Sequence, residues 1–395
     1  MDHDRLQSDI EQRLQQLRTK DQYRSTKVVT GNADGTCTFQ DRTVVNFSGN
    51  DYLNLAHDIA ASQQYQQTAS SIVGSTASAL VSGRSIWHER LEQQLATFEN
   101  TEAALLFPTG YAANLGIMTG LVQSADLVLC DRDNHASIID ACRQCDGRML
   151  VFRRDRLENL EATLKKRRSE YRHAFIVCDG VYSMDGTVPD LKHVVDIANR
   201  YEAAVIVDEA HGTGILGCDG RGASQFCEVE DQIFARVGTM SKAMGGLGGF
   251  VVSNQSTINL LRNTARTQFF STALPPAICA AMLESIRIIQ SEPKRRTALQ
   301  SLVHRAHSTC QDLGLKTIGS GPAPIVPIII GNSESAQQVS RQLLQHGFLV
   351  PAIRPPTVKA GTERLRLSLN IHHTEDQISE VCKTIQQFVS RSDRP

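Results

Sequence analysis

The stretches AVIVDEAHGTG (residues 204–214) and GTMSKAMGGLGGF (residues 238–250) decide the fold of this chain. The first is a short run of apolar, mostly β-branched residues that ends in an acid, Asp208, with His211 three residues later. An apolar run bounded by Gly predicts a buried strand of an α/β sheet. Ligands of such sheets bind beyond the carboxyl ends of the strands, which is where Asp208 and His211 fall.

The second stretch places one lysine, Lys242, in a loop of small residues. Gly and Ala around it leave room for a bulky group to approach the backbone, and Thr239 precedes it by three residues. Pyridoxal phosphate (PLP) requires a lysine that forms a Schiff base and a carboxylate against its pyridine nitrogen. Asp208 alone would be read as a helix cap, and Lys242 alone as a surface residue. The two together favour a PLP site.

The composition is ordinary for a soluble globular enzyme. The 395 residues (43.5 kDa) are 41% hydrophobic and 21% charged, which favours two domains or one large domain with an appendage. A net charge of −1 gives no indication of nucleic acid or an anionic membrane as a partner. The charged N-terminus is unlike a signal peptide, and no apolar run is long enough to span a membrane.

The ten cysteines are scattered, and several lie in apolar runs. This usage is typical of reduced, buried thiols in a cytoplasmic protein. Cys142 and Cys145 form a CxxC, but no second pair stands at zinc-finger spacing. We therefore interpret them as residues of a helix and expect no metal site.

Three further segments repeat the pattern of an apolar run followed by polar residues: 104–121, 127–141 and 174–191. With helical sequence between them, these runs predict a mostly parallel sheet with helices on both faces. In the first segment, Gly110 and Tyr111 begin a helix whose free backbone N–H groups can bind phosphate. His135 follows the second run as a helix cap or as an aromatic face against a PLP ring.

The rest of the chain predicts smaller elements. These are an amphipathic helix over 6–17, a hairpin at 31–36, long helical sequence from 278 to about 313, strands at 325–330 and 363–369, and helices at 335–345 and 375–389. We expect three parts: an N-terminal helix and hairpin segment (1–50), a large PLP-binding domain (51–285) and a small C-terminal α/β domain (286–395).

These motifs together resemble the α-oxoamine synthases, a family of fold-type I PLP-dependent transferases. The resemblance covers essentially the whole chain and rests on NDYLNLA, HERLE, FPTGYAAN, DNHASIIDA, DGVYSMDGT, VDEAHGTGILG, GTMSKAMGG and FFSTALPPA, in the order of the family. Within the family, AIRPPTVKAGTERLRLSL (residues 352–369) is most similar to the biotin-pathway member.

The resemblance implies a PLP-dependent C-acyltransferase that condenses L-alanine with a pimeloyl thioester, on CoA or acyl carrier protein, and releases CO2 and the free thiol. It also implies a homodimer with its active sites at the interface. Two alternatives stay open. One is a sibling enzyme that joins glycine to an acetyl or succinyl group or serine to a long acyl chain, and the other is a PLP-fold binding protein without catalysis.

The resemblance assigns roles around the cofactor ring. Lys242 would form the Schiff base and act as general base, and Asp208 would pair with the pyridine nitrogen. His135 would stack on the ring and contact the substrate. His211 and Ser183 would lie near the phenolic oxygen or the phosphate side.

Other matched positions would bind phosphate or substrate. The amides of Gly110 and Tyr111, with Thr239, would bind the phosphate, and Thr272 would reach the phosphate of the other subunit. The guanidinium of Arg354 would hold the carboxylate of the amino acid.

Asn50, Thr357 and Arg24 match family positions associated with the acyl substrate or with catalysis. The chain departs from the family pattern at Thr76 and Ala77, which replace glycines, and at Trp87 and Lys359. None of these departures concerns the residues assigned to PLP, so they bear on the preferred acyl chain.

Overall fold

The computed structural model describes residues 3–20 and 22–392, which divide into two compact units. The central unit comprises residues 50–301 and 321–324, and the terminal unit comprises the other described residues. Helix α12 (Pro293–Asp312) contributes its first turns to the central unit and its last turns to the terminal unit. The three-part division expected from the sequence stays a prediction.

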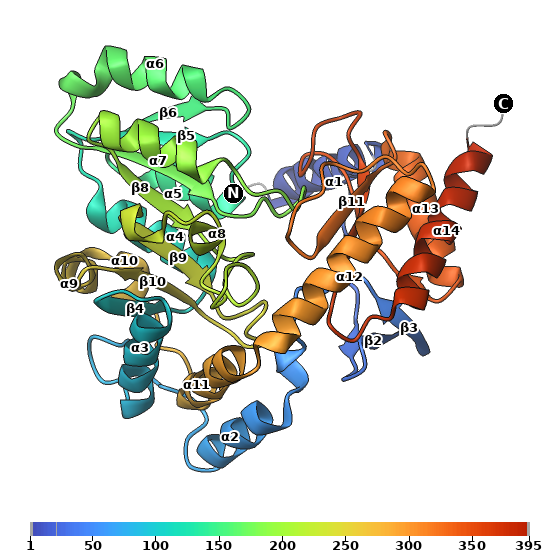
Figure 1. Cartoon of the computed structure of the whole chain (residues 1–395), viewed down its shortest axis with the longest axis horizontal. Helices are drawn as coiled ribbons and strands as arrows, with labels where there is room; N and C mark the ends of the chain where they lie inside the picture. The colour runs from blue at the N-terminus through green and yellow to red at the C-terminus, as the bar shows by residue number, and fades with distance from the viewer. Residues whose placement is uncertain (1–2, 21, 393–395) are drawn as a thin grey trace. The chain divides into compact units, whose positions relative to one another are not determined.

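A seven-stranded sheet forms the middle of the central unit (Figure 1). Its order is β4-β10-β9-β8-β7-β5-β6, and β10 alone runs antiparallel to its neighbours. The strands are β4 (Ala103–Phe107), β5 (Leu127–Asp131), β6 (Arg148–Phe152), β7 (Ala174–Asp179), β8 (Ala204–Asp208), β9 (Ala235–Thr239) and β10 (Gly249–Ser253). The mostly parallel sheet expected from the sequence is confirmed.

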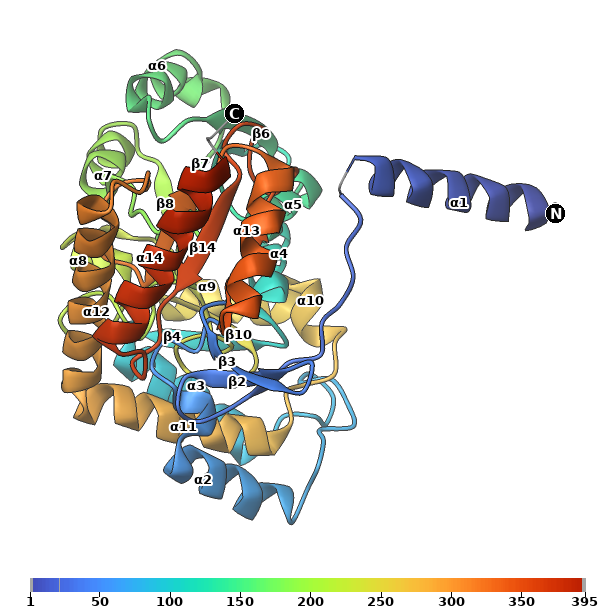
Figure 2. The same ribbon diagram turned by 90° about the vertical axis from the view of Figure 1, so that its right-hand side faces the viewer.

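Helices cover both faces of this sheet. Figure 2 shows α4 and α5 on one side of it and α7 on the other. The helices are α2 (Ile59–Ala69), α3 (Ile86–Phe98), α4 (Gly110–Leu121), α5 (Ala136–Gln144), α6 (Leu157–Arg167), α7 (Leu191–Arg200), α8 (Ala223–Phe226), α9 (Gln255–Thr264), α10 (Arg266–Phe269) and α11 (Pro276–Ser291), with 3-10 turns η1 (Leu55–His57), η2 (Arg168–Glu170) and η3 (Glu230–Gln232). Because both faces are covered, strands such as β5 and β7 are buried along their whole length and lack polar alternation.

The core beneath α4, α5 and α9 fixes the sheet edge at which these helices begin. Leu105, Val128 and Val177 of the strands and Ile117 and Leu261 of the helices are buried in one apolar cluster. Burial of such side chains contributes roughly 1.5–3 kcal/mol each, which anchors the first turns of α4 and α5 to the sheet.

The helical sequence predicted from 278 to about 313 is present as two consecutive helices, α11 and α12. Pro293 explains the break, because proline lacks a backbone N–H and clashes with the preceding turn of a continuing helix. Proline is tolerated in the first turn, where both Pro276 and Pro293 stand.

The terminal unit contains two small sheets, β1-β2-β3-β12 and β11-β14-β13. Its elements are α1 (His3–Thr19), β1 (Thr30–Gly31), β2 (Thr36–Phe39), β3 (Arg42–Asn46), β11 (Ile325–Ile329), α13 (Ser333–Gln345), β12 (Phe348–Leu349), β13 (Ala352–Ile353), β14 (Arg364–Ser368) and α14 (Glu375–Ser392). The predicted hairpin, strands and C-terminal helices are confirmed. Helix α1 is also confirmed, but none of its residues is buried, and Leu6 is 58% exposed.

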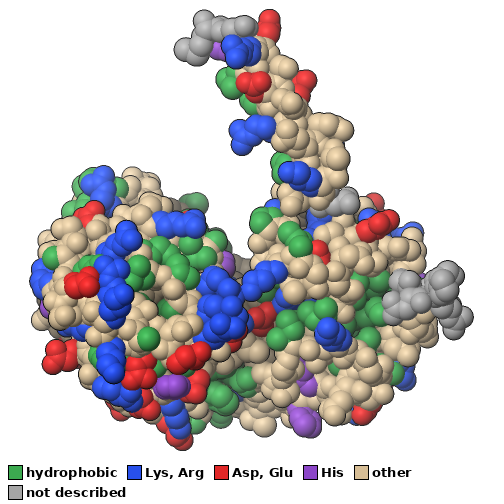
Figure 3. Space-filling model, turned by 90° about the horizontal axis from the view of Figure 1, so that it is seen from above, with side chains coloured by type: hydrophobic (Ala, Val, Ile, Leu, Met, Phe, Trp, Pro, Cys, Tyr) green, Lys and Arg blue, Asp and Glu red, His purple; other side chains and the backbone are tan. Residues whose placement is uncertain are grey.

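The surface has no single sign of charge. Acidic and basic side chains are interspersed on the face drawn in Figure 3, in keeping with the formal charge of −1. Among residues 3–20 and 22–392, no helix combines the length and the apolar character needed to cross a membrane.

Candidate functional site

Two acids lie side by side at the carboxyl edge of the central sheet. Asp179 ends β7 and Asp208 ends β8, and the strand register pairs these two residues directly. Both are buried, at 5% and 6% exposure. Val237, near the end of β9, pairs with Asp208 on its other side, so the loop carrying Lys242 leaves the sheet at the same edge.

The carboxylate of Asp208 is fixed by two donors. Its Oδ2 accepts from Nδ2 of Asn114 in α4 at 2.6 Å, and its Oδ1 accepts from the backbone N–H of Ala210 at 2.8 Å. The same Asn114 amide donates to Ser137 Oγ at 3.0 Å. Ser137 Oγ in turn lies 2.8 Å from Nδ1 of His135. One chain of hydrogen bonds therefore links Asp208 to His135.

His135 is the N-cap of α5, as expected from its place before the helix. Its backbone N–H donates to Asp179 Oδ2 at 2.7 Å, which ties the start of α5 to the end of β7. Burial lowers the pKa of the imidazole, although the nearby charge of Asp208 opposes this effect. The ring is thus kept in its neutral form, which suits contact with an apolar ring face.

Lys242 is half-buried in the turn between β9 and β10. Burial raises the pKa of Asp179, as does the charge of Asp208, whereas the charge of Lys242 lowers it. Lys242 also lowers the pKa of His135, after the larger effect of burial. The lysine charge therefore acts on groups from two neighbouring elements, and the sheet edge brings Lys242, Asp208 and His135 into one electrostatic environment.

The loop after Lys242 requires glycine. The N–H of Gly245 donates to the Lys242 carbonyl at 2.9 Å, and Gly245 has a φ of +73°. A Cβ at Gly245 would lie 2.2 Å from the backbone nitrogen of Ala56. The small residues around Lys242 thus let the loop pack against the segment that contains Asn50 and Tyr52.

His211 lies in the turn that follows β8 and is buried. Its Nδ1 is 2.7 Å from the hydroxyl of Tyr52, which also donates to Oδ1 of Asn50 at 3.1 Å. The structure therefore brings together two predicted site residues, Asn50 and His211, through a tyrosine that the sequence did not single out.

The predicted phosphate-binding group meets at the start of α4. A Cβ at Gly110 would lie 3.2 Å from Cβ of Thr239, so Thr239 faces the first turn of the helix. The amide of Tyr111 is the next in that turn. A helix start with glycine at its first position and a hydroxyl beside it fits the phosphate of PLP, and buried Asp208 at the same edge fits its pyridine nitrogen.

The neighbouring acid in the motif, Glu209, has a structural task. Its carboxylate accepts from the backbone N–H groups of Ala223 and Ser224, each at 2.7 Å, and from the Ser224 hydroxyl at 2.5 Å. Burial raises its pKa. Because successive strand residues face opposite sides, Glu209 holds the loop to α8 while Asp208 faces α4.

The other predicted residues are described by their own surroundings. Ser183 is half-buried in the turn after β7, and Thr272 is exposed and pairs with Ser78 in an isolated bridge. In the terminal unit, an Arg24 guanidinium nitrogen donates to Thr357 Oγ1 at 3.4 Å. The Thr357 N–H donates to the Arg354 carbonyl at 3.0 Å, so these three predicted substrate residues are neighbours. Their roles stay predictions.

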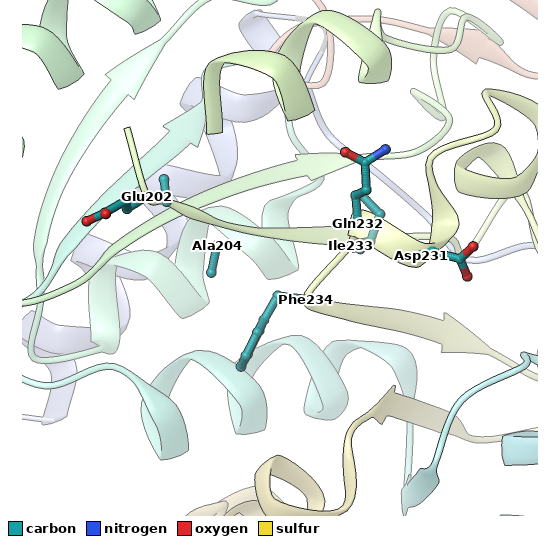
Figure 4. Close-up of a pocket in the computed structure, with 7 residues that line it drawn as sticks. Glu202, Ala204, Asp231, Gln232, Ile233 and Phe234 are labelled. Carbon is teal, nitrogen blue, oxygen red and sulfur yellow. The ribbon is translucent and has the colours of Figure 1, made fainter. Parts of the chain in front are cut away.

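A hollow of about 380 Å³ lies at the other edge of the sheet (Figure 4). It is lined by residues before and at the starts of β8 and β9, including Glu202, Asp231 and Phe234. These are the amino ends of the strands, and none of the predicted site residues lines the hollow. It is therefore not the candidate site.

Sequence reasoning missed Asn114, Ser137, Tyr52 and Asp179 as parts of the site. Each lies inside a motif that was noted, but their partners are distant in the chain, with Asn114 and Asp208 94 positions apart. A polar residue inside an otherwise apolar helix, as Asn114 is in α4, is the signal that could have indicated a buried partner.

Comparison with known proteins places the chain in a family. The family model "Aminotransferase class I and II" matches residues 42–385. The 8-amino-7-oxononanoate synthase 2 of Bacillus subtilis is 38% identical over 97% of this chain and 98% of its own length. The 8-amino-7-oxononanoate synthase of Methylococcus capsulatus is 40% identical over 95% of this chain and 97% of its own.

Solved structures agree with this placement. A serine palmitoyltransferase from S. paucimobilis with a bound PLP–myriocin aldimine has a TM-score of 0.90 at 30% identity, with 97% of each chain covered. An 8-amino-7-oxononanoate synthase from Francisella tularensis has a TM-score of 0.75 at 26% identity, with 88% of this chain and 98% of that one covered. The chain has the fold-type I architecture and belongs to the aminotransferase class I and II family.

Proposed function

We propose that this chain is a PLP-dependent C-acyltransferase of the 8-amino-7-oxononanoate synthase type. The observation that carries the proposal is the buried strand-end Asp208, held by Asn114 and linked to His135 at the edge where the Lys242 loop emerges. When bound, PLP would supply a protonated ring that accepts the electrons of a carbanion. The relatives' names support the choice among PLP reactions.

Each side chain at the site would have a role that follows from its chemistry. Asp208 is fixed by two donors and would present a carboxylate that favours protonation of the pyridine nitrogen. Lys242 would form the Schiff base with the cofactor and, as an amine, move the proton at the α-carbon of the bound amino acid. His135, kept neutral by burial, would cover one ring face. Gly110, Tyr111, Thr239, Ser183 and His211 would complete the contacts of the cofactor.

L-alanine and a pimeloyl thioester are the proposed substrates. Arg354 is the candidate clamp for the amino acid's carboxylate, since a guanidinium can bind both of its oxygens. Thr357, Arg24 and Asn50 are proposed to contact the acyl substrate. The product would be 8-amino-7-oxononanoate, with CO2 and the free thiol released, which is a step of biotin biosynthesis.

Serine palmitoyltransferase activity is the second candidate. The higher TM-score to the serine palmitoyltransferase, 0.90 against 0.75 for the Francisella structure, favours it. The relatives of about 40% identity favour the alanine reaction. Differences of one methylene in an apolar pocket change binding by about 1–3 kcal/mol, so fold similarity is a weak guide to the acyl chain.

We also propose that the protein acts as a homodimer in the cytoplasm. The support for the dimer is the exposure of four apolar side chains, from 65% to 84%, in segments that flank the Ser78–Thr272 bridge: Val73, Leu80, Val81 and Phe270. A second copy covering this surface would bring Thr272 to the partner's phosphate site. Analytical sedimentation measures the dimer dissociation constant of Val81→Glu and of the control Val28→Glu, in which the replaced valine is 87% exposed. We expect only Val81→Glu to weaken the dimer. A Val81→Glu dimer as stable as that of wild type would contradict the proposal.

The proposed reaction is tested by a substrate screen on the purified protein loaded with PLP. Thiol release is measured with alanine and pimeloyl-CoA or pimeloyl carrier protein, and with serine and palmitoyl-CoA or glycine and short acyl-CoA. We expect the alanine–pimeloyl pair to give the highest kcat/KM. A higher value for serine with palmitoyl-CoA would establish the second candidate, and no turnover with any pair despite bound PLP would indicate a non-catalytic protein.

A further inference from the structure

We propose that a hollow in the terminal unit binds the phosphate groups of a nucleotide. The hollow has a volume of about 530 Å³ and is formed by the turn between β2 and β3, by Lys27 ahead of β1, and by the last turns of α13. Its volume is in the range of sites for small molecules, about 300–1,000 Å³. No residue assigned to the proposed reaction lines it.

Three cations converge on this hollow: Lys27, Arg42 and Arg341. All three are exposed, and no carboxylate lines the hollow with them. Across the described part of the chain, none of the three forms an ion pair, and Asp41 in the adjacent turn is hydrogen-bonded to none of them. The Lys27 ammonium instead lies 5.5 Å from the centroid of the Phe39 ring. The lining of the hollow therefore carries three positive charges and no carboxylate, which favours an anionic ligand.

The remaining lining distinguishes a nucleotide from a simple anion. Phe39 and Leu344 belong to an apolar cluster of the terminal unit and line the hollow, and we call this apolar part its floor. Gln40 and Gln345 add amide groups that can both donate and accept hydrogen bonds. Inorganic phosphate would contact only the cations. A nucleotide would contact the cations with its phosphates, and the apolar floor and the glutamine amides with its base.

Calorimetric titration of the full chain measures the proposed binding without any turnover, so its result is independent of the proposed reaction. The probes are inorganic phosphate, ADP and coenzyme A. The variant is Arg42→Gln with Arg341→Gln. The matched control, Arg13→Gln with Lys383→Gln, removes the same charge from exposed residues of the terminal unit outside the hollow. Circular dichroism and thermal unfolding show that each variant is folded.

We expect ADP to bind the wild-type chain at least about tenfold more tightly than phosphate does, and to bind more weakly as the salt concentration rises. The Arg42/Arg341 variant should bind ADP at least about tenfold more weakly than wild type, whereas the control variant should bind it as wild type does. A higher affinity for coenzyme A than for ADP, lost in the same variant, would identify a thioester carrier as the source of the nucleotide. An affinity for ADP that equals or exceeds the affinity for coenzyme A would identify a free nucleotide as the ligand. Equal affinity for ADP and phosphate, no binding at millimolar concentration, or no effect of the double substitution would overturn the proposal.

Discussion

The side-chain nitrogen of Asn114 lies 2.6 Å from Oδ2 of Asp208 and joins the first half of α4 to the carboxyl end of β8. Asn114 is buried, and its amide has a second acceptor in Ser137 Oγ. A single amide thus orients the acid proposed to face the pyridine nitrogen and, through Ser137, the histidine proposed to face the ring.

Replacing Asn114 by alanine should weaken catalysis without unfolding the protein. A hydrogen bond to a charged group contributes about 1.5–3 kcal/mol, so we expect kcat/KM to fall about 10–100-fold and the affinity of the apoprotein for PLP to fall as well. Steady-state kinetics and cofactor titration measure both effects. Asn199→Ala, which removes an exposed amide bonded to Gln232, is the control and should change neither. Unchanged PLP affinity in Asn114→Ala would remove Asn114 from the site.

Tyr52→Phe tests the link between Asn50 and His211. Loss of the hydroxyl removes the partner 2.7 Å from His211 Nδ1, so the imidazole loses its fixed orientation and tautomer. We expect kcat/KM to fall about tenfold, with a changed pH profile. Tyr65→Phe, on the exposed surface of α2, provides the comparison and should behave as wild type. An unaltered pH profile in Tyr52→Phe would show that the tyrosine is not a positioning residue.

Gly249→Ala should disturb the start of α4. A Cβ at Gly249 would lie 2.4 Å from the carbonyl oxygen of Thr109 and 2.6 Å from the nitrogen of Gly110, so the helix start must shift. We expect a loss of about 1–3 kcal/mol in the free energy of unfolding and weaker PLP binding. Gly74→Ala, where a Cβ meets nothing within 4 Å, is the matched substitution. Equal PLP affinity in the two variants would argue against a phosphate seat at Gly110.

The strands and most helices could be predicted because their signals are local. The apolar run before Asp208 and the capping position of His135 need only a few adjacent residues to be recognised. The break between α11 and α12 also had a local signal, the proline at position 293, but the sequence analysis predicted helical sequence on both sides without a break there. The exposure of α1 could not be predicted, since an apolar stripe shows which face prefers burial and not what covers it.

The candidate site was predicted in part, because local motifs reveal some of its residues but not the contacts made by packing. Motifs identified Lys242, Asp208 and His135. The hydrogen bonds of Asn114 and Tyr52 depend instead on how the sheet and helices pack, because their partners lie 94 and 159 positions away in the sequence. Arg24 and Thr357 are hydrogen-bonded although they are 333 positions apart in the sequence. No spacing rule reaches that far, so contacts of this kind require the folded chain.

His373 should make stability depend on pH in the terminal unit. The ring is 3% exposed, and its Nδ1 accepts from the N–H of Asn370 at 3.1 Å. Burial lowers the pKa of His373 to about 4, against an opposing effect of backbone hydrogen bonds. Below the ordinary value of about 6.5 the unfolded chain binds a proton that the folded chain does not, so the free energy of unfolding falls as pH drops from about 6.5 to 4.

The full effect is about 3 kcal/mol, and urea unfolding at a series of pH values measures it. His373→Asn should lose this component of the pH dependence between pH 4 and 6.5. His304→Asn, at an exposed position of α12, should keep it. Parallel pH profiles for wild type and His373→Asn would contradict the assignment.

Lys242 is proposed to carry the cofactor at the sheet edge where Asp208 would contact its ring. The direct measurement is to load the protein with PLP, reduce it with borohydride and locate the modified residue by peptide mass spectrometry, with Lys242→Ala as the control. We expect one reduced pyridoxyl group, on Lys242, and none in the variant. Modification of another lysine, or equal labelling of the variant, would contradict it.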